Sequence, residues 1–152
     1  MADQPALYCY DGSDGAKRAL HLASGLIPGA PAVVLAIWQS AMVGALSAPY
    51  AVASVDAIEQ ADAAARQRAA ELSSEGCRLL AGAAGIPEPR TAESLGSVWR
   101  TVLDSAEAVD ARVIVLGSRG LGAISSAILG SVSHGVANHS HRPVLIVPGP
   151  GA

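Results

Sequence analysis

The residues of this chain that are best placed to do chemistry lie in a glycine-rich segment in its last third. Its skeleton is Gly117, two residues, Gly120, nine residues, Gly130 and then Ser131. Gly117 would allow a sharp exit from a preceding strand, and Gly120 would remove a side chain where backbone approaches a phosphate. Gly130 and Ser131 open a predicted helix, whose free N–H groups and positive dipole end attract an anion. The dipole contributes only about 0.3–1 kcal/mol at an exposed site, so several backbone N–H donors are needed to hold a triphosphate.

Side chains of the same segment add polar groups. Ser131 and Ser133 provide hydroxyl donors near the start of the predicted helix. Arg119 is the only cation in the segment. Two interpretations of it stay open: a clamp on phosphate, or a solvated loop arginine.

A second group of candidate residues follows the first apolar run of the chain. Asp11, Gly12 and Ser13 come directly after residues 6–10. In an open α/β sheet, ligands bind beyond the carboxyl ends of the strands, at the point where the strand order reverses. This turn and the glycine-rich segment are therefore the two candidates for one site. Asp11 is either a ligand contact or a plain helix cap, with Ser13 as the alternative cap.

The elements that would position these residues alternate along the chain. Residues 32–38 are an apolar run without alternation, which is typical of a strand covered on both faces, and residues 112–116 are the clearest predicted strand. The predicted strands are residues 6–10, 32–38, 90–94, 112–116 and 143–147, and the predicted helices are the segment from Ser13 to about residue 26 and residues 56–84, 97–109 and 131–140. Strands that alternate with helices predict right-handed crossovers and one open, parallel, five-stranded, Rossmann-like α/β sheet with helices on both faces. We expect a single domain over residues 1–152, with residues 148–152 as a flexible tail.

Two further segments, an uncharged stretch and the long predicted helix, have less regular sequence patterns. Residues 39–55 carry no charge and contain Gly44 and Pro49, which indicates a loop. That loop is either a mobile cover over a site or an ordinary long connection. In the long predicted helix an apolar stripe is expected to face the sheet; it consists of Ala57, Ala61, Ala64, Ala65, Ala69, Leu72, Leu79 and Leu80.

The composition limits the fold and the kinds of partner. Hydrophobic residues make up 51% of the chain but aromatic residues only 3%, with no Phe, so the core must be built from Ala, Val, Leu and Ile. The formal net charge of -3 and the single lysine, Lys17, give no basic stripe for nucleic acid. The chain starts without a signal-peptide pattern, and its longest apolar run is far shorter than the roughly 20 residues of a membrane-spanning helix. We therefore expect a cytoplasmic protein that binds neither nucleic acid nor membranes.

Other reactive residues are not organised as a site. Cys9 and Cys77 lie far apart without a CxxC pattern, and both are interpreted as buried small hydrophobic residues. His134 and His139 are five residues apart and do not share a helix face, so no metal is expected from the protein alone. The chain has no GxxxxGK[ST] and no GxSxG motif, and Ser125 stands where GxGxxG would need its last glycine.

The segment GSRGLGAISSAILGSVSHGVANHSHRPVLIVP closely resembles the C-terminal signature of universal stress proteins, and YDGSDGAKRAL resembles the first strand and turn of that family. The resemblance covers essentially the whole chain. It implies the strand order 3-2-1-4-5, membership of the ATP-binding subclass and a dimer joined through Val144 to Val147. Asp11 would then contact the ribose or a magnesium ion bound with ATP, and the backbone near Ile37 would face the adenine, with Trp38 crowding or stacking on the base. The implied nucleotide site comprises Asp11, Gly12, Ser13, Ile37, Leu116, Gly117, Ser118, Arg119, Gly120, Gly130, Ser131, Val132 and Ser133.

Three functions remain open at this point. The leading one is a nucleotide-dependent regulatory module of the stress response, with little or no hydrolysis because no residue stands out as a general base. The second is an enzyme on the same scaffold, such as a weak ATPase or a nucleotidyl transferase. The third is a protein-interaction module without nucleotide. An unidentified regulatory protein partner is also expected, and the exposed apolar edge of the last strand predicts a homodimer.

Overall fold

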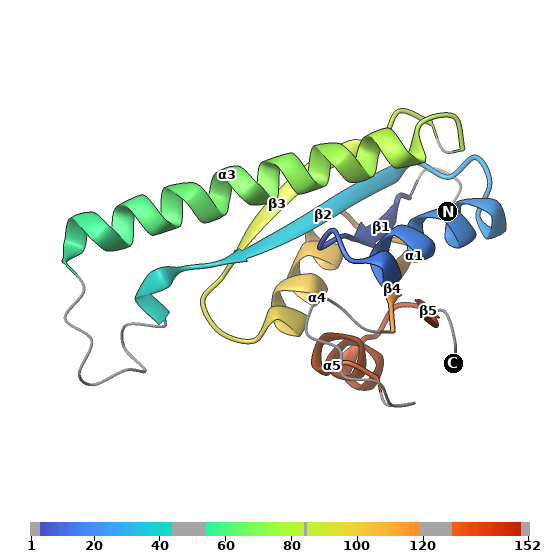
Figure 1. Ribbon diagram of the computed structural model, residues 1–152. Coiled ribbons are helices and arrows are strands. Elements are labelled where there is room, and N and C mark those ends of the chain that lie inside the picture. The colour runs from blue at the N-terminus through green and yellow to red at the C-terminus, as the bar shows by residue number, and fades with distance from the viewer. Residues whose placement is uncertain (1–3, 44–53, 84, 119–128, 150–152) are drawn as a thin grey trace.

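The computed structural model describes residues 4–43, 54–83, 85–118 and 129–149. Its elements alternate as the sequence predicts (Figure 1). In chain order they are β1 (Ala6–Cys9), α1 (Asp14–Leu26), β2 (Ala32–Gln39), α3 (Val55–Leu80), β3 (Glu88–Ser94), α4 (Val98–Ala108), β4 (Val113–Gly117), α5 (Ser131–His139) and β5 (Val144–Val147). No helix of the described residues is long and apolar enough to cross a membrane.

The five strands form one parallel sheet in the order β3-β2-β1-β4-β5. This confirms the predicted α/β fold and the predicted strand order. Helices α1 and α3 lie on one face of the sheet, and α4 and α5 lie on the other (Figure 1). The strand order reverses between β1 and β4, which places the carboxyl ends of these two strands side by side.

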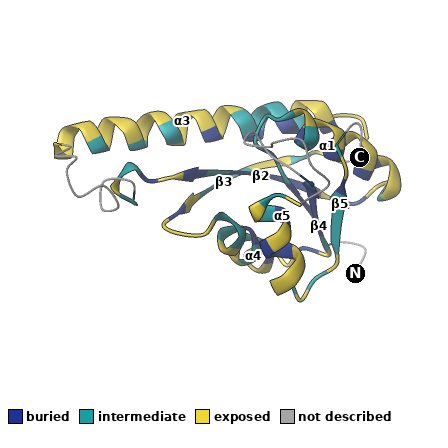
Figure 2. Cartoon of the chain, turned by 60° about the horizontal axis from the view of Figure 1, so that its bottom comes forward, coloured by how far each residue is buried: buried dark blue, intermediate teal, exposed yellow. Residues whose placement is uncertain are grey.

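Alternate side chains of the central strands build two separate cores. Tyr8 and Val34 pack towards α1 and α3, whereas Leu7, Leu35 and Ile114 pack towards α4 and α5. Figure 2 shows the buried residues concentrated in the middle of the sheet. Both layers are filled mainly by small aliphatic side chains, as the low aromatic content predicts.

The polar segment of β3 forms a strand because it lies at the edge of the sheet. It pairs along its whole length with β2, from Glu88 opposite Val33 to Ser94 opposite Gln39. An edge strand has to bury only part of its surface, and it tolerates Pro89, which cannot donate a backbone hydrogen bond. The predicted range of residues 90–94 is therefore two residues too short.

The apolar stripe predicted for α3 is buried only in part, and its buried members all lie in the second half of that helix. Ala57, Ala61 and Ala64 are exposed, and Leu79 is 52% exposed. The helix has 26 residues and is about 39 Å long, whereas the eight residues of β2 span only about 26 Å. The first half of α3 therefore extends beyond the sheet (Figure 1), and the residues that it buries, Ala69, Ser73, Gly76 and Leu80, all lie in the second half.

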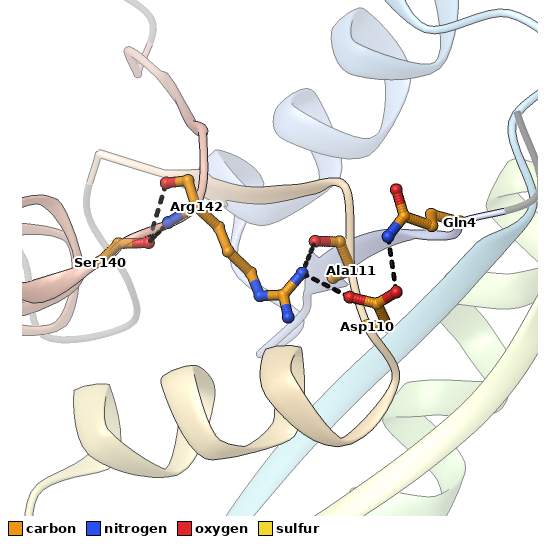
Figure 3. A network of polar contacts seen from close by, with 5 residues as sticks. All are labelled: Gln4, Asp110, Ala111, Ser140 and Arg142. Atoms are coloured by element: carbon orange, nitrogen blue, oxygen red, sulfur yellow. Dashed lines mark hydrogen bonds and ion pairs between the residues drawn. The ribbon is translucent and has the colours of Figure 1, made fainter. Parts of the chain in front are cut away.

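A polar network ties together the amino ends of β1, β4 and β5 (Figure 3). Arg142 Nη1 donates to Asp110 Oδ1 at 3.0 Å and to the carbonyl of Ala111 at 2.5 Å. Gln4 Nε2 donates to the other carboxylate oxygen of Asp110 at 2.5 Å. The hydrogen bonds from Gln4 and Arg142 lower the pKa of Asp110, because they favour its ionised form. The network lies at the amino ends of these strands, whereas the two candidate loops lie at the carboxyl ends.

Helices α4 and α5 approach each other closely at Gly135. A Cβ atom built on Gly135 would lie 2.4 Å from Cγ of Trp99, well inside van der Waals contact. Trp99 also stacks on His139, with ring centroids 4.3 Å apart. The glycine is therefore required by the indole that packs over it.

We predict that Gly135→Ala destabilises the protein by roughly 1–3 kcal/mol, because the added methyl group overpacks the contact with Trp99. Gly25→Ala is the matched control. A Cβ at Gly25 meets nothing within 4 Å, and alanine in a helix is better than glycine by about 0.8–1 kcal/mol, so this variant should gain stability. Urea unfolding of the wild type and both variants checks the signs. Equal shifts in the two variants would contradict the close packing at Gly135.

Candidate functional site

The two candidate loops meet at the carboxyl ends of β1 and β4. A Cβ atom on Gly117 would lie 2.8 Å from the carbonyl carbon of Gly15 and 3.2 Å from the backbone nitrogen of Ala16. The end of β4 is thus in direct backbone contact with the first turn of α1. Gly117 is the last residue of β4 and does not have a positive φ, so the contact with α1 is what requires glycine at this position. Its predicted role in a sharp exit from the strand stays a prediction. Leu116, before it, is buried.

The turn after β1 is built by its own hydrogen bonds. Ser13 is the N-cap of α1, since its Oγ accepts from the backbone nitrogen of Ala16 at 3.2 Å. Asp11 Oδ1 accepts from the backbone nitrogen of Ser13 at 3.0 Å, so Asp11 braces the turn and Ser13 caps the helix. Gly12 has φ +82°, a left-handed conformation that favours glycine. The other carboxylate oxygen of Asp11 has no hydrogen-bond partner among the described residues.

The glycine-rich segment is closed at its base. Gly130, the N-cap of α5, donates its N–H to the carbonyl of Ser118 at 2.7 Å. Ser133 Oγ lies 2.8 Å from the same carbonyl and 3.0 Å from that of Gly130. The Ser133 hydroxyl therefore donates its proton to a backbone carbonyl. This differs from its predicted role as a donor to phosphate. Arg119 and Gly120 lie outside the described residues.

Among the described residues, the N–H groups that begin α5 have no hydrogen-bond partner. In α1 and α3 a serine caps the first turn, Ser13 and Ser54 respectively, whereas the first turn of α4 has no side-chain cap. In α5 no side chain of the described residues caps the first turn, and the N–H groups of Ser131, Val132 and Ser133 have no acceptor there. These N–H groups carry the positive end of the helix dipole, so the arrangement suits an anion.

Ser118 is anchored to β5 as well as to α5. Its N–H donates to the carbonyl of Val147 at 2.8 Å, and its Oγ accepts from the N–H of Gly149 at 3.3 Å. Gly149 belongs to the predicted flexible tail, whose residues 150–152 lie outside the described residues. The base of the glycine-rich segment is therefore fixed to the sheet on one side and to a helix on the other.

Ile37 lies near the end of β2, where β1 has already ended. The register between these strands stops at Cys9 opposite Leu35, and Tyr10 donates its N–H to the carbonyl of Leu35. In a parallel strand every second residue directs its N–H and C=O to the same neighbour. Ile37 therefore directs both groups towards the position that β1 vacates, beside Asp11.

Trp38 does not occupy that position. Its side chain packs on the opposite face of the sheet, against Ala36 and Ala69, and Arg66 of α3 lies 5.0 Å from its ring centroid. The indole is only 7% exposed. The expectation that Trp38 crowds or stacks on a base is therefore wrong, because the ring would first have to leave this packing.

One residue that holds the end of β2 was not found from the sequence. Asp62 of α3 accepts from Ser40 Oγ at 2.8 Å and from the backbone nitrogen of Ala41 at 2.6 Å. The carboxylate thus fixes the chain just beyond Ile37. It is 22 residues from Ser40, and no motif connects the two positions.

The histidines of α5 take part in local contacts. His134 Nε2 lies 2.9 Å from Asn138 Nδ2, and His139 Nδ1 lies 2.9 Å from the carbonyl of Gly135. Within the described part of the chain, no three His, Cys, Asp or Glu side chains are grouped as metal ligands would be.

Cys9 lies at the carboxyl end of β1 on the α4 and α5 side. It is partly buried in the same cluster as Ile37 and Val132, whereas Cys77 belongs to the cluster on the other face. Burial, with a smaller contribution from the negative charge of Asp11, raises the pKa of the Cys9 thiol to about 12. Both cysteines are free thiols.

We predict that Cys9 reacts slowly with iodoacetamide at neutral to mildly alkaline pH. The thiolate is the reactive species, and a pKa raised to about 12 keeps its population low, so the rate should increase roughly tenfold for each pH unit below that value. Peptide mass spectrometry measures the reaction at Cys9 separately from Cys77. The same chain unfolded in urea is the control. Equal rates for the folded and unfolded chains would contradict the raised pKa.

Comparisons with known proteins identify the family of this chain. The model of the universal stress protein family matches residues 4–148. A universal stress protein of Thermus aquaticus, named for its position in a QAH/OAS sulfhydrylase 3' region, is 32% identical over 142 residues, which cover 93% of this chain and 96% of that protein.

Solved structures share the fold at lower identity. Universal stress protein UspA of Lactobacillus plantarum has a TM-score of 0.75 at 20% identity, with coverage of 97% of this chain and 99% of that one. A universal stress protein in complex with cAMP has a TM-score of 0.65 at 23% identity, with coverage of 97% and 98%. The universal stress protein of Archaeoglobus fulgidus in complex with dAMP has a TM-score of 0.62 at 22% identity, with coverage of 97% and 99%. By the match over residues 4–148 and the Thermus relative, this chain belongs to the universal stress protein family.

Proposed function

We propose that this protein binds ATP at the carboxyl ends of β1, β2 and β4 and acts as a nucleotide-dependent regulatory module of the stress response. The observation that carries the proposal is the convergence of the Asp11 turn with the open N-terminus of α5. The contact of Gly117 with Gly15 brings β4 against α1, and the bond from Gly130 to Ser118 brings α5 to the end of β4. The cAMP and dAMP complexes of other family members support an adenine nucleotide as the ligand.

The phosphates would bind at the start of α5. The N–H groups of Ser131, Val132 and Ser133 and the exposed Ser131 hydroxyl are donors for phosphate oxygens. Arg119 and Gly120 would complete this part of the site. A triphosphate, with more charge than a monophosphate, gains more from this set of donors, which is the reason to propose ATP.

The base would bind beside Ile37. The N–H and C=O that Ile37 directs past the end of β1 are a donor and an acceptor on one edge of a strand. The Watson–Crick edge of adenine offers the matching acceptor and donor, whereas guanine offers them in the opposite arrangement. Asp62 would keep this strand end in place through its bonds to Ser40 and Ala41.

Asp11 would contact the ribose or a magnesium ion that arrives with ATP. Only one of its carboxylate oxygens is used within the turn. Oxygen ligands suit Mg²⁺, which is commonly held by one or two carboxylates together with substrate phosphates. The described residues offer no general base for an attacking water at this position, so we propose that turnover is slow or absent.

We predict that the freshly purified protein contains bound ATP and that Gly130→Val loses it. The φ and ψ of Gly130, -62° and 159°, are open to valine, so the variant should fold while its side chain blocks the approach of phosphate to α5. Gly25→Val, at a position with nothing within 4 Å, is the matched control. Denaturation, chromatography and mass spectrometry identify the released nucleotide, and calorimetry with added ATP and GTP tests preference for adenine.

Each outcome separates the open functions. ATP in the wild type and in Gly25→Val, but at least tenfold less in Gly130→Val, would support the proposed site. A wild type that is empty and ignores added ATP would favour the nucleotide-free interaction module. Steady-state hydrolysis well above background, lost in Asp11→Ala, would favour the weak ATPase.

We further propose that the protein forms a homodimer through the edge of β5. Val144, Leu145 and Ile146 are apolar and only half-buried, and β5 ends the sheet. The carbonyls of Pro143 and Val147 accept from β4, so by alternation the N–H and C=O of Val144 and Ile146 point to the open edge. Such an edge pairs readily with a second copy.

We predict that light scattering gives about twice the monomer mass of 15.2 kDa at micromolar concentration. Ile146→Pro removes an outward N–H without breaking a bond to β4, so it should shift the protein towards monomer. Ile146→Ala loses the side chain but keeps the N–H, and should remain dimeric. A monomeric wild type, or equal behaviour of the two variants, would count against pairing through this edge.

A further inference from the structure

The hydroxyl of Ser133 is placed to act on the glycine-rich segment rather than on a ligand. Ser133 is the third residue of α5 and is only 2% exposed. Its Oγ lies 2.8 Å from the carbonyl of Ser118, which is 15 positions earlier in the chain. The hydroxyl has one proton, and both oxygens within reach are backbone carbonyls, of Ser118 and Gly130.

The carbonyl of Ser118 is a fixed point against which α5 can be positioned. The N–H of Ser118 is bonded to Val147 of β5, and its Oγ accepts from Gly149. Its carbonyl receives the N–H of Gly130 at 2.7 Å and the hydroxyl of Ser133. One acceptor thus holds the N-cap and the first turn of α5 at the same time.

The bond from Ser133 adds a second link between the first turn of α5 and Ser118. The body of the helix is held separately, by the buried Val136 and by the close packing at Gly135. The first turn, which carries the N–H groups of Ser131 and Val132, is held to Ser118 by the bonds from Gly130 and Ser133. Without the Ser133 bond only one of these two links is left, so the direction of those N–H groups is less well fixed.

We propose that the side chain of Ser133 positions the phosphate site: its hydroxyl directs the N-terminus of α5 and does not itself contact the nucleotide. The inference rests on the proposed function, because it concerns the same site. It assigns to this hydroxyl a role in the strength of triphosphate binding and none in recognition of the nucleoside. Replacing a residue with a merely structural role would change stability but leave the ratio of the affinities for ATP and for adenosine unchanged.

The test compares ATP with adenosine in the full-length protein. We expect Ser133→Ala to weaken ATP binding by about 3- to 10-fold, the factor for loss of one ordinary hydrogen bond, and to change adenosine binding by less than about twofold. Ser73→Ala is the matched control. Ser73 is 1% exposed, and its Oγ donates to the carbonyl of Ala70 at 3.0 Å, but it lies in α3 away from α5. It should leave both affinities unchanged. Titration calorimetry gives the affinities, and thermal unfolding gives the stability of each variant.

The outcomes separate this inference from the proposed function. If the wild type binds ATP and Ser133→Ala lowers only its affinity for ATP, the inference holds. If the wild type binds ATP but Ser133→Ala weakens ATP and adenosine equally, or neither, the positioning role is overturned while the nucleotide site stands. If the wild type binds no adenine nucleotide, the proposed function fails and the inference fails with it.

Discussion

The contact between the end of β4 and the first turn of α1 is the constraint on which the rest of this site depends. It is a contact of backbone with backbone, since a single methyl group on Gly117 would lie 2.8 Å from the Gly15 carbonyl carbon. Because β4 ends against α1, the turn that begins α1 and the segment that leaves β4 emerge at the same place. No side chain could substitute for this contact, since any side chain at Gly117 would separate the two elements.

The fold follows from the sequence more completely than the site does. Buried strands such as β2 and β4 consist of continuous aliphatic residues, and the alternation of these runs with helical segments leaves few topologies. The edge strand β3 and the ends of α3 are less well predicted. Their limits depend on which neighbours cover them, and that information is not local: the first half of α3 is exposed because the sheet beneath it is shorter than the helix.

At the site, residue types were easier to predict than their physical roles. Gly117 was expected to allow a sharp exit from the strand, and the structure adds a close approach to α1 that requires glycine there. Trp38 was expected beside the base, but the alternation of strand residues directs it to α3. Asp62 carries no signal at all, because its partners, Ser40 and Ala41, follow a different element. Each difference concerns contacts between segments far apart in the chain, which spacing within a motif does not encode.

The two ends of the parallel strands are stabilised in different ways. At the amino ends of the strands, Asp110 accepts hydrogen bonds from Arg142 and from Gln4. At the carboxyl ends, the N–H groups that begin α5 have no acceptor among the described residues. The start of that helix is nevertheless held by two hydrogen bonds to the carbonyl of Ser118. A helix start that is already fixed in position, with N–H groups still unpaired, would lose little conformational entropy when it binds a ligand. Ser118 is also bonded to Val147, so one residue links the start of α5 to the edge strand β5.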